Sequence, residues 1–161
     1  MAVQTEDGER VRALLTFYRE AHYDVRDDAG ELHTLRVGEP MPTALEKWLG
    51  AATTCAYLTA CNPHSQPLSP AQNARRMQQL LVELDAASLR YLRGDGHMPG
   101  ESWREPSVLV AGLPLSELDA LVRRHEQNAI LIGACSEPMR LRLYRDDWRF
   151  FAAPTFDLEW A

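Results

Sequence analysis

Apolar and polar positions near the start of the chain recur with helical spacing. The apolar positions fall at i, i+3, i+4 and i+7 and are Val11, Leu14, Leu15 and Tyr18. Residues with this spacing share one face of a helix, so the stripe predicts an amphipathic helix over about residues 7–22. The next segment, "YDVRDDAGELHTLRV", has two alternating runs around "DDAG". That pattern is typical of a β-hairpin with a polar turn.

Short apolar runs farther along the chain predict strands. "TCAYLTA" (54–60), "PSVLVAGL" (106–113) and "AILIGAC" (129–135) are each bounded by turn residues and are too short for helices. "SLRYLRG" predicts a weaker strand, and a glycine-rich loop is expected after it, over residues 94–104. "MRLRLYR" alternates like a half-exposed strand.

Three further helices are expected between these strands. A short one should lie around residues 43–50. Ser69 is a good N-cap, and Gln72 three residues later completes a capping box, which predicts a helix from Pro70 to about Ala87. Ser116 is expected to cap the third of these helices.

Together the elements predict a single α+β domain over residues 1–161. Its mixed β-sheet should have about 4–6 strands and should pack against about 3–4 helices. The length of 161 residues is sufficient to bury a sizeable core. Residues 145–161 are rich in aromatic side chains and have no clear element pattern. We expect a C-terminal arm that packs on the body or mediates self-association, so a homodimer is one alternative.

Charge and cysteine content narrow the setting of the protein. The formal net charge is −6, and Lys47 is the single lysine among 17 basic residues. A nucleic-acid partner is therefore not expected, because phosphate binding needs clustered cations. The N-terminus lacks an apolar signal region and no run is long enough to cross a membrane, so we expect no membrane partner. Cysteines Cys55, Cys61 and Cys135 lack CxxC spacing, which favours reduced thiols in a cytoplasmic protein.

The predicted order of strands and helices brings polar residues to one end of the sheet. If the strand ending at Ala60 points up, the next helix descends and "SLRYLRG" points up again. The strands at residues 106–113 and 129–135 then both start at the top. Ligand sites in α/β-type sheets gather at such an end. The polar residues expected there are Asn62, Asn73, Trp103, Glu105, Ser107, Gln127 and Asn128.

Asn73 gives an independent indication of a polar cluster. It precedes Met77 by four residues and Leu80 by seven, so it lies on the apolar face of its helix. A buried amide without partners lowers stability, and we expect it to find them at the same end of the sheet. The candidate partners are Asn62, Glu105 and Gln127.

Two roles remain open for each member of this cluster. Glu105 is the candidate catalytic residue, because desolvation near amides and an indole would raise its pKa toward neutrality. It is equally a candidate for a structural carboxylate that accepts backbone N–H groups. The amides of Asn62, Asn73 and Gln127 either bind a ligand or tie three loops together.

Other chemistries find less support in the sequence. Cys61 and His64 form either a thiolate–imidazole pair or a packed thiol beside a surface histidine. No HExxH or paired CxxC spacing is present, so we predict no metal site. "GDGHMPG" is not followed by a helix pattern, which excludes a dinucleotide fingerprint, and the sequence names no cofactor.

Four segments carry a resemblance to a known family. "FYREAHYDV", "TACNPHSQPLSPAQN", "GESWREPSVLV" and "HEQNAIL" resemble the bacterial family catalogued as domain of unknown function 3293, over about residues 9–135. The family has no assigned activity, so the resemblance implies which residues belong together and not what they do. The residues it marks are Asn62, Pro63, Ser65, Asn73, Trp103, Glu105, Pro106, Ser107, Gln127 and Asn128.

These observations lead to two functional hypotheses. The first is a small-molecule-binding protein with a polar site at one end of the sheet, and whether it is also an enzyme stays open. The second is a non-enzymatic interaction or regulatory module that acts through its aromatic arm. The aromatic residues of that arm are Trp148, Phe150, Phe151, Phe156 and Trp160.

Overall fold

The computed structural model describes residues 2–153 and 155–161, and side chains from residue 7 onward. The strands are β1 (His22–Arg26), β2 (Leu32–Leu35), β3 (Thr54–Leu58), β4 (Tyr91–His97), β5 (Arg104–Ala111), β6 (Ala129–Ala134), β7 (Arg140–Leu143) and β8 (Leu158–Trp160). The α-helices are α1 (Ala2–Glu20), α2 (Thr43–Leu49), α3 (Pro70–Ala86) and α4 (Leu115–Arg124), and the 3-10 helices are η1 (Pro63–Ser65) and η2 (Asp146–Phe150).

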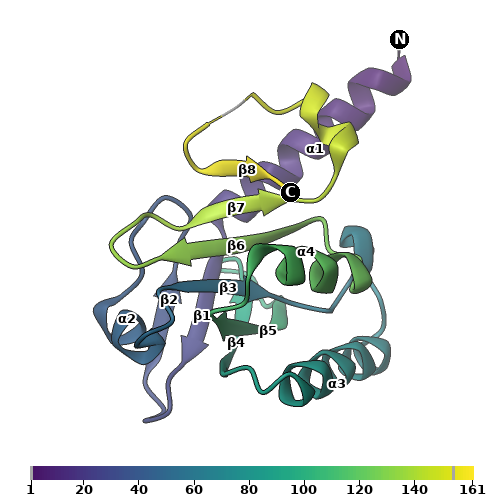
Figure 1. Ribbon diagram of the computed structural model, residues 1–161. Coiled ribbons are helices and arrows are strands. Elements are labelled where there is room, and N and C mark those ends of the chain that lie inside the picture. The colour runs from purple at the N-terminus through teal and green to yellow at the C-terminus, as the bar shows by residue number, and fades with distance from the viewer. Residues whose placement is uncertain (1, 154) are drawn as a thin grey trace.

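All of these strands form one curled sheet in the order β2-β1-β4-β5-β3-β6-β7-β8 (Figure 1). Neighbouring strands are antiparallel except for the parallel pair β7 and β8. The α+β class is confirmed, but eight strands exceed the predicted number of about 4–6. The difference arises because the hairpin β1–β2 extends the sheet on one side, and β8 from the C-terminal arm extends it on the other.

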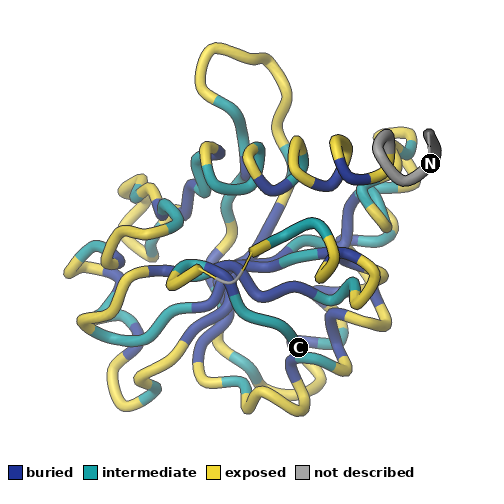
Figure 2. The backbone as a smooth tube through the Cα atoms, turned by 90° about the horizontal axis from the view of Figure 1, so that it is seen from above, coloured by how far each residue is buried: buried dark blue, intermediate teal, exposed yellow. Residues whose placement is uncertain are grey.

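The two faces of the sheet bury two separate apolar clusters. Successive strand side chains point to opposite faces, so neighbouring residues of β3 and β5 belong to different clusters. Tyr57 and Leu109 pack on the face covered by α1 and α2, whereas Leu58 and Val108 pack under α3 and α4. Figure 2 shows the buried strands at the centre and exposed residues along the outer helices and loops.

Helix α3 begins as the sequence predicts. The Ser69 hydroxyl accepts from the Gln72 backbone N–H at 3.2 Å, and the Gln72 side chain accepts from the Ser69 N–H at 3.0 Å. The predicted cap at Ser116 is wrong, because α4 starts at Leu115 after Pro114. The N-cap residue is Pro114, whose ring fixes φ at −58°, so the helix begins two residues earlier than a cap at Ser116 would place it, with no side-chain cap.

The predicted glycine-rich loop is partly a strand. β4 continues to His97 and pairs with both β1 and β5. Gly94 permits this pairing, because a Cβ at that position would lie 1.8 Å from the Asp24 carbonyl oxygen. The glycines that suggest a loop in the sequence therefore allow a close approach of two backbones.

Helix α1 ends at Glu20, two residues before the predicted end, because β1 begins at His22. The predicted half-exposed character of β7 is also wrong. Arg142 is buried and pairs through two nitrogens with Asp119, at 2.9 and 2.7 Å, and also with Glu159 of β8. This ion-pair network lets an arginine occupy a buried strand position.

The C-terminal arm is mostly part of the fold. β8 pairs with β7, and the Trp148 side chain in η2 is only 3% exposed. Phe150 and Phe156 are 88% and 79% exposed. Residue 154 of the predicted arm lies outside the described residues. Within the part of the chain that is described, no helix is both long and apolar enough to cross a membrane.

The strand directions bring the predicted polar residues to one end of the sheet, as expected. β3 is antiparallel to β5 and β6, and β5 is antiparallel to β4. The ends of β3 and β4 therefore lie beside the starts of β5 and β6. β1 also starts there, since His22 pairs with His97, so the last turn of α1 reaches the same place.

Candidate functional site

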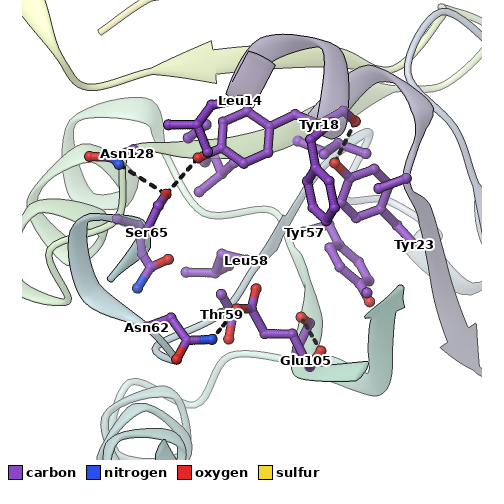
Figure 3. Close-up of a pocket in the computed structure, with 18 of the residues that line it drawn as sticks. Leu14, Tyr18, Tyr23, Tyr57, Leu58, Thr59, Asn62, Ser65, Glu105 and Asn128 are labelled. Carbon is purple, nitrogen blue, oxygen red and sulfur yellow. Dashed lines mark hydrogen bonds between the residues drawn. The ribbon is translucent and has the colours of Figure 1, made fainter. Parts of the chain in front are cut away.

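A cavity of about 280 Å³ lies at this end of the sheet, between α1 and the strands (Figure 3). Its volume is at the small end of the range for ligand pockets. Seven of the eight side chains predicted from the sequence line it, namely Asn62, Ser65, Trp103, Glu105, Ser107, Gln127 and Asn128. Asn73 does not line the cavity; it lies behind Asn62 and holds it in place.

The start of β5 places two polar side chains inside the cavity. Glu105 and Ser107 alternate with the outward Pro106 and share their face with Leu109, which is fully buried. An ordinary strand would bury apolar residues on this face. Here the apolar pattern is interrupted at the two positions that border the cavity.

Asn62 connects three parts of the site. Its Nδ2 donates to Glu105 Oε2 at 2.8 Å, and its Oδ1 accepts from the Asn73 side chain at 2.8 Å and from the Leu68 backbone N–H at 3.0 Å. The backbone N–H of Asn62 donates to Asn73 Oδ1 at 2.9 Å. The two asparagines thus form a reciprocal pair that fixes the Asn62 amide against the carboxyl of Glu105 (Figure 3).

The loop that carries Asn62 has an unusual backbone. Asn62, His64 and Ser65 have φ values of 49°, 54° and 58°, in the left-handed region. Each such residue costs on the order of 1–3 kcal/mol and needs support from its surroundings. Part of that support is the hydrogen bond from the His64 N–H to the Glu126 carbonyl at 2.7 Å.

Ser65 joins this loop to α1 and to the start of β6. Its hydroxyl lies 2.7 Å from Tyr18 Oη and accepts from Asn128 Nδ2 at 3.0 Å. Burial raises the pKa of the Tyr18 phenol, so it remains protonated and cannot act as a base toward Ser65. The three side chains form one connected wall of the cavity (Figure 3).

Glu105 is the electrostatic centre of the site. Burial raises its pKa from the ordinary 4.5 to about 7, although the hydrogen bond from Asn62 acts in the opposite direction. Among the described residues, no lysine or arginine lines the cavity. Oε2 is held by Asn62, whereas Oε1 has no hydrogen-bond partner among those residues. The carboxyl therefore presents one free oxygen to the cavity.

Aromatic side chains form much of the remaining wall. Tyr23 Oη donates to the Tyr18 carbonyl at 2.6 Å, and Tyr57 Oη donates to the Asp24 carbonyl at 2.9 Å. Burial raises the pKa of both phenols, so both stay neutral. Their two rings meet edge to face, with centroids 5.4 Å apart. They are therefore wall components whose hydroxyls are already used by the protein.

Trp103 and Gln127 also line the cavity, and they differ in exposure and in contacts. Trp103 remains 37% exposed and packs edge to face on Phe17, with ring centroids 5.4 Å apart. Gln127 is buried, and its Nε2 donates to the carbonyls of Cys61 and His125, both at 3.0 Å. Gln127 thus ties the loop after β3 to the start of β6 while it lines the cavity.

The sequence predictions missed the aromatic wall. Leu14, Phe17 and Tyr18 from α1 line the cavity, and so do Tyr23 and Tyr57 from the sheet. Leu14 and Tyr18 belong to the apolar stripe of the first helix. Their spacing is the same as that of core residues, so it does not indicate that they border a cavity. The segment "FYREAHYDV" was a usable signal, because it is one of the four segments that carry the family resemblance.

The structure gives Cys61 and His64 separate surroundings. The Cys61 thiol is buried 3.8 Å from the Pro106 carbonyl, and burial raises its pKa, which disfavours a thiolate. His64 Nε2 lies 3.2 Å from Glu126 Oε2. Of the two readings left open by the sequence, the packed thiol fits these contacts.

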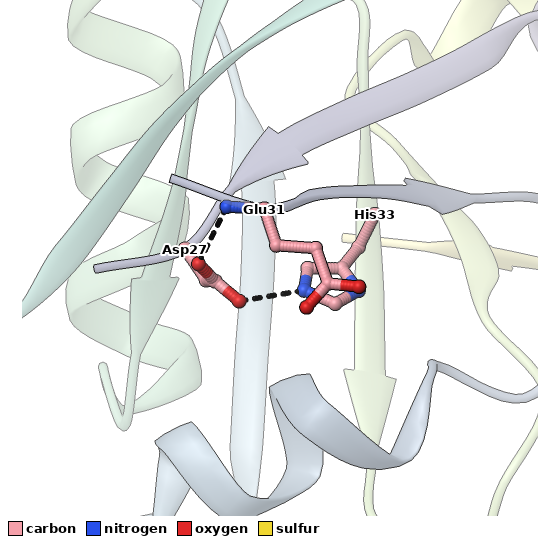
Figure 4. A group of neighbouring side chains, drawn as sticks. All are labelled: Asp27, Glu31 and His33. Atoms are coloured by element: carbon pink, nitrogen blue, oxygen red, sulfur yellow. Dashed lines mark hydrogen bonds and ion pairs between the residues drawn. The ribbon is translucent and has the colours of Figure 1, made fainter. Parts of the chain in front are cut away.

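A cluster at the opposite end of β1 has the residue types of a metal site. The possible ligand atoms of Asp27, Glu31 and His33 lie within 4.8 Å of one another (Figure 4). Asp27 Oδ2 lies 2.8 Å from His33 Nε2, and Oδ1 accepts from the backbone N–H groups of Ala29 and Glu31, both at 2.9 Å. The Asp27 side chain therefore stabilises the hairpin turn between β1 and β2, which accounts for the cluster without a metal ion.

Comparison with known proteins identifies a family. Residues 58–130 match the family model described as "Protein of unknown function (DUF3293)". The match confirms the family resemblance over these residues and contains every polar residue predicted for the site, whereas the segment "FYREAHYDV" precedes the matched range. The chain matches no curated protein and no solved structure.

Proposed function

We propose that this protein, which matches the DUF3293 family model over residues 58–130, is a small-molecule-binding protein whose ligand occupies the cavity beside Glu105. One observation carries the proposal. Glu105 is half-buried, its Oε2 is held by Asn62, and its Oε1 faces the cavity with no partner among the described residues. A carboxyl that served only the fold is expected to have both oxygens paired, because removal of a carboxylate from bulk water without partners lowers stability.

The backbone of the loop after β3 supports the same proposal. Three left-handed residues in a row of four cost stability, and such strain concentrates at ligand sites. The strain places Asn62 against Glu105 and Ser65 against Tyr18 at once. A loop that only turned the chain would not need both positions.

The proposed chemistry of the site is proton exchange by Glu105. A carboxyl with a pKa of about 7 exists in both protonation states near neutral pH, as a general acid or base requires. Nucleophilic chemistry at Ser65 has less support. Its hydroxyl contacts Tyr18 and Asn128, and neither is a base that would accept its proton.

The C-terminal arm supports a second candidate, an interaction module. Phe150 and Phe156 are exposed there, and exposed apolar side chains are a feature of contact surfaces. The candidate ranks lower because Trp148 is buried and Phe151 and Trp160 pack against the core.

A fragment screen followed by ¹H–¹⁵N NMR on the full chain tests the proposal. Gly96 lines the cavity, and a Cβ there would meet Tyr23 and the Glu105 carbonyl oxygen at the ordinary distances of 3.8 and 4.0 Å. Gly96→Val should therefore narrow the cavity without breaking β4. The matched control is Arg93→Val, on the same strand but at an exposed position.

We expect fragments that shift the resonances of Gly96, Glu105 and Ser107, and that bind Arg93→Val but not Gly96→Val. If no fragment shifts those resonances, or if Gly96→Val binds the same fragments equally well, the proposal is wrong.

A further inference from the structure

We infer that the ligand of this cavity is a small organic cation, an amine whose ammonium group pairs with Glu105 and packs against the aromatic wall. The inference rests on the proposed function, because it names the ligand class of the same site. Three features of the cavity lead to it: the charge of its lining, the hydrogen-bonding groups left unused, and the surface that the tyrosines present.

The charge of the lining selects against anions. Glu105 is its one carboxylate, and no lysine or arginine among the described residues lines the cavity beside it. The imidazole of His97 also lines the cavity, but its Nε2 lies 2.8 Å from Asp24 Oδ2 and is engaged there. An anionic ligand would add a second buried negative charge without a counterion. A cation supplies the partner that the Glu105 carboxylate lacks.

The hydrogen-bonding groups of the lining favour a ligand that donates. The side-chain nitrogen of Asn62 donates to Glu105 Oε2, that of Gln127 to the Cys61 carbonyl, and that of Asn128 to Ser65 Oγ. Each amide nitrogen therefore already serves at least one protein acceptor, and that of Gln127 serves two. Glu105 Oε1 is an acceptor with no donor among the described residues, and an ammonium N–H provides one.

The tyrosines leave ring surface for the ligand. Their hydroxyls are already bonded to protein atoms. Tyr18 bonds to Ser65 and Tyr23 to the Tyr18 carbonyl (Figure 3), and Tyr57 bonds to the Asp24 carbonyl. Phe17 and Trp103 add two further rings to the lining. Aromatic rings attract cations through their quadrupoles, and aromatic side chains around a ligand are a recognised arrangement for organic ammonium groups.

The titration of Glu105 couples this binding to pH. Its pKa in the unliganded cavity is about 7, and an ammonium group would stabilise the ionised form. The other titratable groups around the cavity are Tyr18, Tyr23, Tyr57, Cys61 and His97. Burial raises the pKa of the three phenols and of the thiol, so these four groups stay neutral near pH 7. Binding of a cation should therefore tighten as pH rises through the pKa of Glu105.

Three probes of one shape and different charge test the inference: benzylamine, benzyl alcohol and benzoate. Each is titrated into the full chain by NMR at about pH 5 and about pH 8, where Glu105 is mostly protonated and mostly ionised. Glu105→Gln removes the charge, and Glu101→Gln is the control because Glu101 is exposed in the loop between β4 and β5.

We expect benzylamine to shift Glu105 and Trp103, and to bind about tenfold or more tightly at the higher pH. The affinity should fall about tenfold in Glu105→Gln and stay unchanged in Glu101→Gln. Equal or tighter binding of benzyl alcohol or benzoate in the cavity would overturn the inference and leave the cavity a ligand site. If no probe shifts the cavity resonances, the inference also fails, and the wider fragment screen decides the proposed function separately.

Discussion

Asn62 and Glu105 lie 43 residues apart in the sequence, and their side chains meet in a hydrogen bond of 2.8 Å. Asn62 donates to one carboxyl oxygen and leaves the other directed at the cavity. The bond stabilises the ionised form of Glu105 only in part, since burial still holds its pKa at about 7.

Glu105→Gln should stabilise the protein at high pH. The folded pKa of Glu105 is about 7 and the ordinary value is 4.5, so the folded state holds its proton more tightly. Its contribution to stability is present below about pH 4.5 and is lost as pH rises through about 7. The amide carries no charge, so the variant should match the parent at about pH 4 and exceed it by up to ~3 kcal/mol at about pH 8.

Urea unfolding of both proteins at the two pH values measures this difference in the free energy of unfolding. Glu101→Gln, at an exposed position, should show no comparable pH dependence. A Glu105→Gln variant that is less stable than the parent at about pH 8 would mean that the carboxylate holds the fold together.

Asn62→Ala should destabilise the protein by about 2–4 kcal/mol. It strands the amide of Asn73 and the backbone N–H of Leu68, and it forces alanine into a left-handed conformation. Asn62→Gly is the matched variant, because glycine loses the same contacts but tolerates positive φ. Thermal unfolding should place glycine about 1 kcal/mol above alanine. Equal stability of the two variants would contradict the backbone part of the argument.

Tyr18→Phe should cost about 1 kcal/mol, because it removes the hydroxyl that contacts Ser65 in a partly buried network. Tyr91→Phe provides the comparison: it removes a hydroxyl that bonds to Asp85 at 2.9 Å in an exposed contact. Chemical unfolding of the two variants measures both effects. A larger loss for Tyr91→Phe would show that the wall of the cavity is not a connected network.

Gly94→Ala and Gly96→Ala should differ sharply although they lie two residues apart on β4. A Cβ at Gly94 would lie 1.8 Å from the Asp24 carbonyl oxygen, which the sheet cannot accommodate. We expect a loss of about 3 kcal/mol or more there, or no folded protein. At Gly96 the nearest atoms lie at 3.8 and 4.0 Å, so the change should stay within about 1 kcal/mol. Circular dichroism during thermal unfolding distinguishes the two.

The helices and strand directions could be predicted because each depends on local patterns. The capping box at Ser69 and Gln72 begins α3 where expected, and strand order along the chain brings Asn62 and Glu105 to one end of the sheet. The site could be predicted from polar residues at positions where an apolar one is expected. Glu105 and Ser107, for example, lie on the face of β5 that is otherwise apolar.

The missed features depend on contacts between distant segments. In the sequence, Gly94 belongs to a glycine-rich stretch that favours a loop. In the structure it is a strand residue, because the backbone of Asp24 in β1 packs so close that a side chain would not fit. Tyr18 has the spacing of a core residue, and its position beside a cavity follows from where α1 meets the loop at Ser65. The buried charge of Arg142 is neutralised by ion pairs with Asp119 of α4 and Glu159 of β8, two segments that the local sequence does not place beside it.

The most direct test is a ¹³C NMR titration of the Glu105 side-chain carboxyl, assigned by its absence in Glu105→Gln, with and without benzylamine. The account predicts a midpoint near pH 7 without the amine and a lower midpoint with it, because the cation stabilises the carboxylate. A midpoint near the ordinary 4.5 that benzylamine leaves unchanged would mean that Glu105 is an ordinary solvated carboxylate and is not held for a cationic ligand.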